Sequence, residues 1–376
     1  MKILQLGKFY PPSCGGIQNV IFSITEGLNE KENTRCDVLC SNGNKKYKQE
    51  IVNGYSIIRT KSLGIIASTS ISPQMIFKLK KIIADYDILQ IHLPDPMANL
   101  SLFLSKLTKQ KIVIHWHSDI IKQKFILKIY NPLQSWLLRR ADKIIATTPN
   151  YIEGSEYLKK HKDKCVSIPI GIDEEIFVTS VSKVKKIRRD YKNRKIVFSL
   201  GRLVYYKGFE YLIKSAKYLD DDYVILIGGE GPLKENLENL ISAEKVAEKV
   251  HLLGKIENKD LANFYTVCDI FCLPSIYKSE AFGIVLIEAM SFAKPIVATN
   301  INGSGVSWVN QDGITGINVE PRDPKALAEA FRIICSDISI CHKFSKNAIQ
   351  RFRKYFTAKK MVADNYELYK KILENK

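Results

Sequence analysis

Two glutamates, Glu280 and Glu288, bracket an uncharged run of seven residues in the second half of the chain. If this segment is helical from Phe282 onward, Glu288 lies about two turns along the helix and Glu280 lies in the loop before it. The N–H groups of a first helical turn have no partner within the helix, so they suit an anion. A carboxylate beside an anion site, with a second one behind it, favours a ligand that carries both phosphate and hydroxyl groups, as a sugar nucleotide does.

Two cations flank a glycine loop that follows an earlier strand-like run. Arg202 and Lys207 lie within the segment Ser199–Gly208. An arginine binds phosphate oxygens with parallel N–H groups and a lysine supplies a compact charge, so together they suit a diphosphate. Any one of the 57 basic residues is credibly an ordinary surface cation, but two of them around one glycine loop favour a binding role.

A glycine pair, Gly15 and Gly16, follows the first strand-like run of the chain. Glycines let the backbone approach a phosphate closely, and the helix that follows supplies N–H groups for it. A simple tight turn is the favoured alternative for the pair taken alone. The pattern differs from Gly-x-Gly-x-x-Gly, so it does not favour a hydride-transfer enzyme.

His115, Trp116 and His117 end another strand-like run and are followed by Ser118-Asp119. A histidine at the end of a strand can contact a substrate as a hydrogen-bond donor or carry a proton, and His117 is the candidate. A packed histidine or a zinc site are the alternatives. Two histidines at this spacing can both ligate a metal, but the sequence shows no clear third ligand, so we predict no metal and no cofactor.

Strand-like and helix-like runs alternate along the chain. Such alternation predicts an α/β fold in which parallel sheets are covered by helices on both faces. The predicted strands are Lys2–Gly7, Asp37–Ser41, Tyr55–Arg59, Ile88–His92, Lys111–His115, Lys143–Thr147, Cys165–Ile168, Lys195–Leu200, Tyr223–Gly228, Val250–Leu253, Ile270–Leu273, Pro295–Ala298 and Thr315–Val319. The predicted helices include Ile17–Asn29, Ser72–Ala84, Tyr206–Ala216 and Pro324–Cys335.

The alternation runs through two rounds, which predicts two doubly wound domains. We expect the first over residues 1–170, the second over 176–355 and a hinge near 171–176, with a helix over 356–376 that packs back on the first domain. Ligands of open α/β sheets bind beyond the carboxyl ends of the strands. The expected active site is therefore a cleft between two such domains that face each other.

The net charge of +18 is concentrated in residues 1–170, which carry 25 Lys and Arg against 13 Asp and Glu. Its candidate partners are nucleic acid, an anionic membrane surface or an anionic substrate, and no nucleic-acid recognition motif supports the first. The eight cysteines lack zinc-site spacing and are expected to be reduced thiols. No signal peptide or membrane span is evident, so we expect a cytoplasmic protein.

The segment Asp119–Arg140 combines apolar residues, including Trp136, with lysines and arginines, and Pro132 is expected to divide it into two pieces. This composition is typical of a helix that lies in a membrane interface. An ordinary helix with a solvated basic face is about as good an interpretation. Together with the charge and the apolar stretch Leu63–Ile71, it favours peripheral contact with the anionic inner face of the cell membrane.

The order of these motifs resembles glycosyltransferase family 4, the retaining group with the GT-B fold, over essentially the whole chain and most strongly over residues 195–320. The resemblance implies two Rossmann-like domains that face each other across a cleft, with a C-terminal helix crossing back. It rests on Gly15-Gly16, Gly201-Arg202, Lys207-Gly208, Gly229-Glu230-Gly231-Pro232, Glu280–Glu288 followed by Ala289-Met290, and Pro295–Thr299.

The resemblance also implies roles for the charged residues. Glu288 would accept hydrogen bonds from the ribose hydroxyls of a nucleotide, and Glu280 would contact hydroxyls of the donor sugar. Arg202 and Lys207 would hold the diphosphate and stabilise it as the leaving group. No enzymic nucleophile and no metal would be required, because electrostatic stabilisation of the leaving group is the main catalytic effect in that mechanism.

The uncharged motif residues receive roles from the same resemblance. The backbone of Phe282, Gly283 and Ile284 would touch the sugar and the phosphate. Gly16 would approach the phosphates from the opposite domain. His117 would contact the sugar near the anomeric centre.

The resemblance therefore implies a retaining hexosyltransferase that uses a GDP- or UDP-sugar. The hexose would be mannose, or else N-acetylhexosamine, glucose or galactose, and the acceptor a lipid-linked saccharide in the synthesis of an O-antigen-like surface polysaccharide. A sugar-nucleotide epimerase and a glycogen-type phosphorylase are alternatives on the same fold, although no signature of a pyridoxal lysine is evident. A non-enzymatic basic protein that binds membrane or nucleic acid explains the charge but leaves the glutamates and glycine loops without a role.

Overall fold

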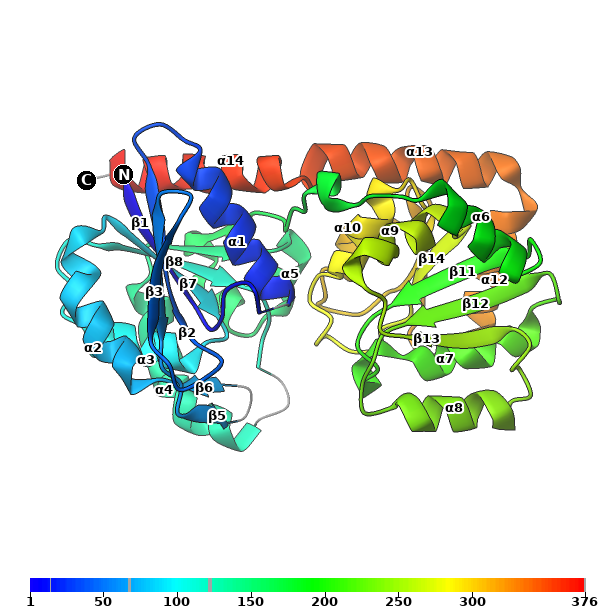
Figure 1. Cartoon of the computed structure of the whole chain (residues 1–376), viewed down its shortest axis with the longest axis horizontal. Helices are drawn as coiled ribbons and strands as arrows, with labels where there is room; N and C mark the ends of the chain where they lie inside the picture. Colours follow the sequence, from blue (N-terminus) through cyan, green and yellow to red (C-terminus); the bar gives the residue numbers. More distant parts are fainter. Residues whose placement is uncertain (14, 67–68, 121–123, 375–376) are drawn as a thin grey trace. The chain divides into compact units, whose positions relative to one another are not determined.

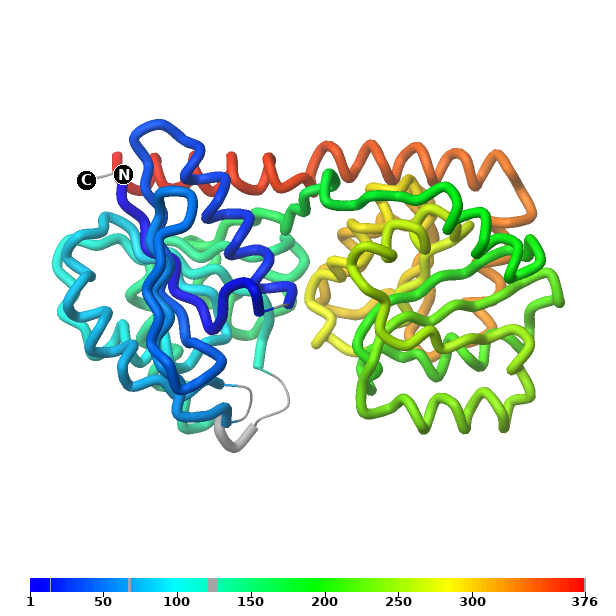
Figure 2. The backbone as a smooth tube through the Cα atoms, viewed as in Figure 1, coloured from blue at the N-terminus to red at the C-terminus, as the bar shows by residue number. Residues whose placement is uncertain are grey.

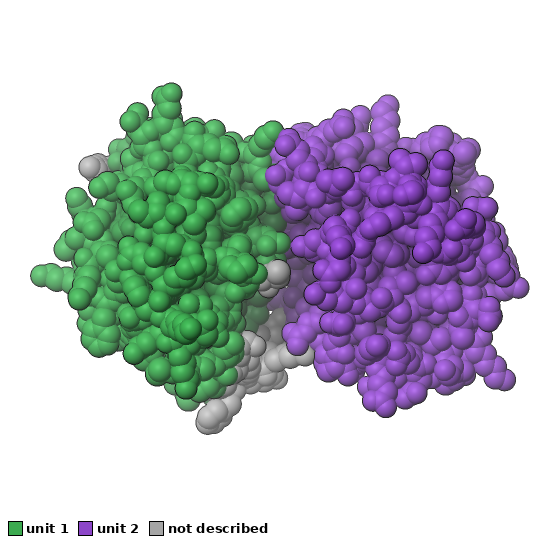
Figure 3. Space-filling model, in the orientation of Figure 1, with its two compact units in different colours: residues 1–171, 358–376 green, residues 172–357 purple. Residues whose placement is uncertain are grey.

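The computed structural model describes residues 1–13, 15–66, 69–120 and 124–374 (Figure 1; the chain trace is shown in Figure 2). The chain forms two compact units, residues 1–171 with 358–376 (unit 1) and residues 172–357 (unit 2), which are coloured separately in Figure 3. Each unit is an α/β domain built on a parallel sheet, so the predicted fold class is confirmed.

Unit 1 contains an eight-stranded sheet in the order β10-β9-β8-β7-β1-β2-β4-β3. All neighbouring strands are parallel except β3, which is antiparallel to β4. The strands are β1 Lys2–Gly7, β2 Arg35–Ser41, β3 Lys48–Val52, β4 Tyr55–Thr60, β7 Ile88–Leu93, β8 Lys111–Trp116, β9 Lys143–Ala146 and β10 Cys165–Ser167, with a separate small pair β5 Gly64–Ile66 and β6 Thr69–Ile71.

The helices of unit 1 cover this sheet and include the last helix of the chain. They are α1 Gly16–Asn29, α2 Pro73–Ile82, α3 Pro96–Phe103, α4 Lys124–Arg140, α5 Pro149–Gly154 and α14 Ala358–Glu374. The terminal helix α14 packs against α1 (Figure 1). Gly27 on α1 permits this approach, because a Cβ atom there would lie 2.7 Å from a methyl carbon of Val362.

Unit 2 contains a six-stranded, fully parallel sheet in the order β13-β12-β11-β14-β15-β16. Its central strands are buried on both faces, which is why they appear in the sequence as nearly continuous apolar runs. The strands are β11 Lys195–Leu200, β12 Tyr223–Gly228, β13 Val250–Gly254, β14 Ile270–Leu273, β15 Ile296–Thr299 and β16 Gly316–Val319. The helices are α6 Val181–Asp190, α7 Phe209–Ser215, α8 Lys234–Ala243, α9 Asn258–Val267, α10 Ile284–Ser291, α11 Val306–Val309, α12 Pro324–Ser336 and α13 Ile338–Tyr355.

Each sheet has one position where the strand order reverses. In unit 1 the reversal lies between β1 and β7, and in unit 2 it lies between β11 and β14. The loops that leave neighbouring strands at such a point diverge to opposite faces of the sheet, which opens a crevice for ligands. The candidate loops that follow β1, β11 and β14 therefore begin at the positions where an α/β sheet binds its ligands.

The prediction that Pro132 divides its segment into two pieces was wrong. The segment around Pro132 is one helix, α4, rather than two pieces, and residues 121–123 of the predicted interfacial segment lie outside the described residues. The buried side chains of Tyr130 and Leu137 hold the helix on either side of the proline, and Tyr130 accepts a hydrogen bond from Asn99 on α3. These contacts compensate for the hydrogen bond that a proline removes from a helix interior.

The antiparallel edge strand β3 was missed. Its residues are exposed or half-buried, so it has no buried face to produce an apolar alternation. The available signal was Asn53-Gly54, both of which have positive φ angles of 48° and 87° between β3 and β4. This dipeptide is typical of the two-residue turn of a hairpin.

Arg351 on α13 anchors that helix to the rest of unit 2. Its guanidinium lies 4.8 Å from the ring centre of Trp308 and is buried, with 9% of the residue exposed. It donates hydrogen bonds to the backbone oxygens of Val309 at 3.0 Å and Trp308 at 2.6 Å.

Replacing Arg351 with alanine is expected to destabilise unit 2 by about 3 kcal/mol, because two carbonyl oxygens lose their donors and the stacking contact is lost. Denaturant unfolding followed by far-UV circular dichroism would measure the change. Arg353→Ala, which removes an exposed arginine from the same helix, is expected to change stability by less than about 0.5 kcal/mol. Equal effects of the two substitutions would contradict the anchoring role.

Candidate functional site

Backbone packing fixes the loop that carries Arg202 and Lys207. Gly229, at the end of β12, has a φ angle of 132°, and a Cβ atom there would lie 1.9 Å from the backbone oxygen of Gly201. A side chain at Gly201 would in turn approach the Cε atom of Lys207 to 3.2 Å. The glycines therefore let the loops after β11 and β12 pack closely and leave room for the lysine.

Gly283 is the residue that immediately precedes the helix carrying Glu288. Its φ angle is 81°, a conformation that favours glycine, and a Cβ atom there would lie 2.9 Å from a methyl group of Leu273. Helix α10 starts at Ile284, two residues after the predicted start at Phe282. Glu288 consequently lies just over one turn along the helix rather than about two.

Lys207 and Glu280, predicted as separate ligand groups, form an ion pair with each other. The Lys207 Nζ and Glu280 Oε2 atoms are 2.5 Å apart, and each side chain is 11% exposed. Ser275 donates a hydrogen bond to the same carboxylate oxygen at 3.0 Å. Burial by itself lowers the pKa of Lys207, but the charge and hydrogen bond of Glu280 outweigh it, so the pKa is raised above its ordinary value. The lysine is therefore a fixed cation with further N–H groups for a ligand.

Glu288 is the second carboxylate of the candidate site in unit 2. Tyr265 on α9 donates a hydrogen bond to Glu288 Oε2 at 2.6 Å. Burial raises the pKa of Glu288, and the opposing effects of the Tyr265 hydrogen bond and the nearby Lys207 charge do not cancel it. Sequence reasoning missed Tyr265, because no motif marks this position near the end of α9.

Arg202 differs from Lys207 in its surroundings. It is exposed, and no described residue forms an ion pair or hydrogen bond with its guanidinium. Arg202 lies three residues before a helical turn at Tyr205–Lys207, so the exposed Arg202 and the buried Lys207 belong to the same loop. The loop thus offers one buried and one exposed cation for an anionic ligand.

The predicted glycine pair of unit 1 lies at the start of α1. Gly15 is the residue before the helix, and Gly16 is its first residue. Neither an acidic residue in the first turn nor a side-chain cap occupies the N–H groups of this helix. Cys14 lies outside the described residues.

Arg59, which sequence reasoning missed, holds the chain before this helix. Its guanidinium donates hydrogen bonds to the backbone oxygens of Tyr10 at 3.1 Å and Pro11 at 2.5 Å. It also pairs with Glu50 at 2.9 Å. The loop after β1 is thus fixed by a buried arginine from β4.

His117 lies at the end of β8 in a cluster of three buried histidines. His115 pairs in register with His92, the histidine near the end of β7, and His92 Nδ1 is 3.0 Å from His117 Nε2. Burial lowers the pKa of His115 to about 3, and lowers those of His92 and His117 well below the ordinary value. All three rings are therefore neutral at physiological pH.

The cluster also supplies the third metal-ligand candidate that the sequence did not show. One ligand atom from each of the three histidines lies within 4.8 Å of the others. His92 was already the last residue of a predicted strand, but only the parallel pairing of β7 with β8 reveals that it faces His115.

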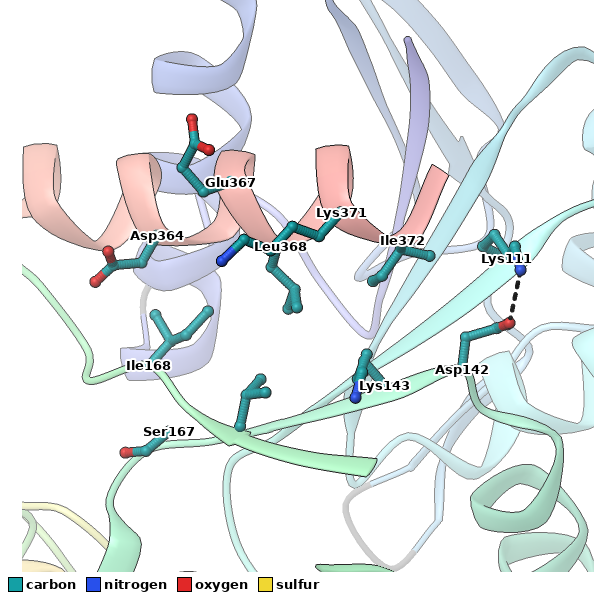
Figure 4. A pocket seen from close by; sticks show the side chains of 11 residues that line it. Lys111, Asp142, Lys143, Ser167, Ile168, Asp364, Glu367, Leu368, Lys371 and Ile372 are labelled. Atoms are coloured by element: carbon teal, nitrogen blue, oxygen red, sulfur yellow. Dashed lines mark ion pairs between the residues drawn. The ribbon is translucent and has the colours of Figure 1, made fainter. Parts of the chain in front are cut away.

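A pocket of about 630 Å³ in unit 1 has mixed charge and lies apart from these loops (Figure 4). It is bounded by α14, by residues 166–168 at the end of β10 and by residues at the amino ends of β8 and β9, among them Lys111 and Asp142, which form an ion pair at 3.4 Å. Ligands of such sheets bind beyond the carboxyl ends of the strands. Its three lysines are balanced by three carboxylates, so it does not select an anion.

Comparison with characterised proteins extends over the full length of the chain. O-antigen chain mannosyltransferase C of Escherichia coli is 33% identical over 377 residues, which is 100% of both sequences. D-rhamnosyltransferase WbpZ of Pseudomonas aeruginosa is 30% identical over 364 residues, covering 95% of this chain and 93% of the relative.

Solved structures show the same two-domain architecture. A sucrose-phosphate synthase from Thermosynechococcus elongatus covers 100% of both chains with a TM-score of 0.79 and 19% identity. The Anabaena protein HepE, solved in complex with UDP-glucose, covers 99% of this chain and 100% of its own with a TM-score of 0.77 and 18% identity.

The two Rossmann-like units and their C-terminal helices define a protein of the GT-B fold class. A family model for glycosyltransferase family 4 matches residues 14–176, and one for glycosyl transferases group 1 matches residues 181–351. With the full-length relatives, these matches show that the chain belongs to glycosyltransferase family 4, a family of retaining enzymes. Membership implies a nucleotide-sugar donor and a saccharide acceptor.

Proposed function

We propose that this enzyme transfers a mannosyl residue from a nucleoside diphosphate to a lipid-linked saccharide during the synthesis of an O-antigen-like polysaccharide. The observation that carries the proposal is the 33% identity, over the whole of both chains, to an O-antigen chain mannosyltransferase. GDP-mannose is the first donor to test. The full-length similarity to a D-rhamnosyltransferase supports a hexose or deoxyhexose donor.

Unit 2 would bind the donor through the four charged side chains at its switch point. Glu288, held by Tyr265, would accept hydrogen bonds from the ribose hydroxyls, and Glu280 would accept them from the sugar. Lys207 and Arg202 would contact the diphosphate, and the first N–H groups of α10 would add to that contact. The buried Lys207–Glu280 pair, at 2.5 Å, supports this assignment because it places a phosphate ligand beside a sugar ligand.

The reaction would depend on stabilising the departing nucleoside diphosphate. The bond from the anomeric carbon to the phosphate oxygen breaks, and the acceptor oxygen forms its bond on the same face of the sugar. The proton of the acceptor hydroxyl passes to a phosphate oxygen of the leaving group. Preorganised cations such as Lys207 lower the barrier by stabilising the charge that develops on that oxygen.

Thermal shift against GDP, UDP and their sugar conjugates would identify the donor, because a ligand of the native state raises its apparent stability. GDP release from GDP-mannose is then expected only when a lipid-linked saccharide is added, with a product that retains the α configuration. Conversion of the donor sugar without an acceptor would instead identify an epimerase. The absence of any nucleotide-dependent shift would contradict the proposal.

We further propose that unit 1 contacts an anionic membrane surface through exposed apolar side chains on β5, α2 and α4. Ile65 and Ile66 on β5 are 58% and 65% exposed, Phe77 on α2 is 65% exposed, and Ile129 on α4 is 73% exposed. Residues 67–68 of this region lie outside the described residues. Basic residues such as Lys78 accompany these side chains, which is typical of binding at the interface of an anionic bilayer. No helix in the described ranges has the length and apolar character needed to cross a bilayer.

Replacing Ile65 and Ile66 together with asparagine is expected to weaken binding to vesicles that contain phosphatidylglycerol about tenfold or more, because two apolar side chains no longer insert. Vesicle sedimentation would measure the binding. Ile176→Asn/Val178→Asn, which changes two exposed apolar residues of unit 2, is the matched control. Equal binding of wild type to neutral and anionic vesicles would contradict the electrostatic part of the proposal.

A further inference from the structure

Glu280, in the loop between β14 and α10, is held at its backbone and at its side chain by other groups of unit 2. Its backbone N–H donates a hydrogen bond to the backbone oxygen of Tyr277 at 2.9 Å. Its backbone oxygen accepts a hydrogen bond from the hydroxyl of Ser304, in the loop after β15. On the side chain, Oε2 pairs with Lys207 Nζ at 2.5 Å and accepts a hydrogen bond from Ser275 Oγ at 3.0 Å. The position of Glu280 therefore depends on the loops after β11, β14 and β15.

The direction of each hydroxyl hydrogen bond is fixed by its acceptor. Ser304 donates to a backbone oxygen, and a carbonyl oxygen can only accept. Ser275 donates to a carboxylate that pairs with a cation, and an ionised carboxylate also only accepts. Ser275 is fully buried, and its own backbone oxygen accepts a hydrogen bond from the hydroxyl of Thr299, at the end of β15. The single hydroxyl hydrogen of Ser275 is therefore used on Glu280.

The loop after β15 supports this arrangement through its backbone and through a buried serine. Ser304 is fully buried, and its hydroxyl hydrogen is used on the backbone oxygen of Glu280. The N–H group of Gly305 donates to the backbone oxygen of Ala281 at 2.9 Å. Two neighbouring residues of the loop after β14 are thus tied to β15, so the backbone of Glu280 is fixed before any ligand binds.

These contacts distinguish the two oxygens of the Glu280 carboxylate. Oε2 has a cation and a hydroxyl as partners, whereas no described residue donates a hydrogen bond to Oε1. Oε1 is also not fully buried, so a ligand can reach it. Glu288 shows the same division, because Tyr265 donates to its Oε2 and no described residue donates to its Oε1. Each glutamate therefore offers a ligand one oxygen.

We infer that Ser275 is a positioning residue that orients Glu280 so that its Oε1 accepts hydrogen bonds from hydroxyl groups of the donor sugar. A lysine ammonium is a compact charge, so Lys207 does not by itself fix the plane of the carboxylate it pairs with. A second donor to the same oxygen fixes that plane. The orientation follows from hydrogen bonds within the free protein, whereas the sugar ligand rests on the proposed function. A carboxylate that is already oriented loses less freedom when the sugar binds.

The orientation can be tested on the free protein by crystal structures of the wild type and of Ser275→Ala. The variant keeps the Lys207 ion pair and loses only the hydroxyl, so the plane of the Glu280 carboxylate is expected to turn from its wild-type direction. Ser215→Ala is the matched control, because it removes a buried hydroxyl that donates to the backbone oxygen of Leu212 at 2.7 Å. It should leave Glu280 unchanged. The same carboxylate plane in wild type and Ser275→Ala would overturn the inference, whichever donor the enzyme uses.

Calorimetric titration with GDP and with GDP-mannose tests the sugar contact. Ser275→Ala is expected to raise the Kd of GDP-mannose about three- to tenfold. The Kd of GDP should change by less than about twofold, because Lys207 still pairs with Glu280 and keeps its other N–H groups for the diphosphate. A purely structural role of Ser275 would weaken both ligands equally, and that result would overturn the inference, as would no change in either.

Donor analogues that each lack one sugar hydroxyl identify the group that binds Oε1. The loss of affinity caused by Ser275→Ala should disappear with the analogue that lacks this hydroxyl. A loss of the same size with every analogue would overturn the contact between Glu280 and the sugar. If the wild type binds neither GDP nor GDP-mannose, the proposed donor is wrong, and the crystal structures of the free proteins still decide whether Ser275 orients Glu280.

Discussion

Replacing Lys207 with alanine is expected to lower kcat/KM for the donor by a factor of about 10²–10³ and to destabilise unit 2 by about 3–5 kcal/mol. The activity falls because the cation that would stabilise the leaving diphosphate is lost. The stability falls because Glu280 is left as an unpaired charge whose side chain is only 11% exposed. Steady-state kinetics and denaturant unfolding would measure the two effects separately.

Arg202→Ala is the matched variant that separates these effects. Arg202 belongs to the same loop but is exposed, so its loss should reduce activity strongly while changing stability by less than about 0.5 kcal/mol. In the double variant Lys207→Ala/Glu280→Gln the unpaired charge is gone, so most of the stability should return while the activity stays low. Near-normal turnover of both single variants would contradict the leaving-group mechanism.

The parts of the candidate site that the sequence proposed are those carried by loops at strand ends. Arg202 and Glu280 each follow a buried parallel strand, and both lie at the reversal of strand order in unit 2. A motif in such a loop is visible in the sequence because its residues are close together along the chain. The α/β fold class could be predicted for the same reason. Each parallel strand appears in the sequence as an apolar run, and each helix appears as apolar residues that recur with the helical period.

The residues that were missed act through partners far away in the sequence. His92 lies in a strand, and its relation to His117 depends on the register of β7 with β8. Tyr265 reaches Glu288 from another helix, and Arg59 reaches a loop 48 residues before it. Such contacts depend on tertiary packing, which a pattern of residue types along one segment does not specify. The ion pair between Lys207 and Glu280 was missed for the same reason, although both residues had been identified.

Glu288→Gln is expected to stabilise the enzyme at neutral pH while weakening its donor binding. Burial raises the pKa of Glu288 in the folded state above its ordinary value of 4.5. At pH values between the unfolded-state pKa and the higher folded-state pKa of Glu288, the folded state binds more protons than the unfolded state. The free energy of unfolding therefore falls as pH rises through this range, and it stays lower at higher pH. Glutamine does not ionise, so the variant escapes this loss and can still accept the hydrogen bond from Tyr265.

Thermal unfolding at several pH values would test the sign of this effect. The unfolding midpoint of Glu288→Gln should exceed that of the wild type by a margin that grows as pH rises from about 4 to 7. Glu235→Gln, at an exposed position on α8, should show no such growing margin. A variant that is less stable than the wild type at pH 7 would contradict the pKa direction.

The donor KM of Glu288→Gln would test whether the ionised carboxylate, which lowers the stability of the free enzyme, contributes to donor binding. Hydrogen bonds from ribose hydroxyls to a charged carboxylate contribute about 1.5–3 kcal/mol, so the donor KM should rise about 10- to 100-fold. A group that destabilises the free enzyme and stabilises the complex is expected at a binding site. Higher stability together with an unchanged KM would therefore remove Glu288 from the donor site without affecting the assignments of Lys207 and Arg202.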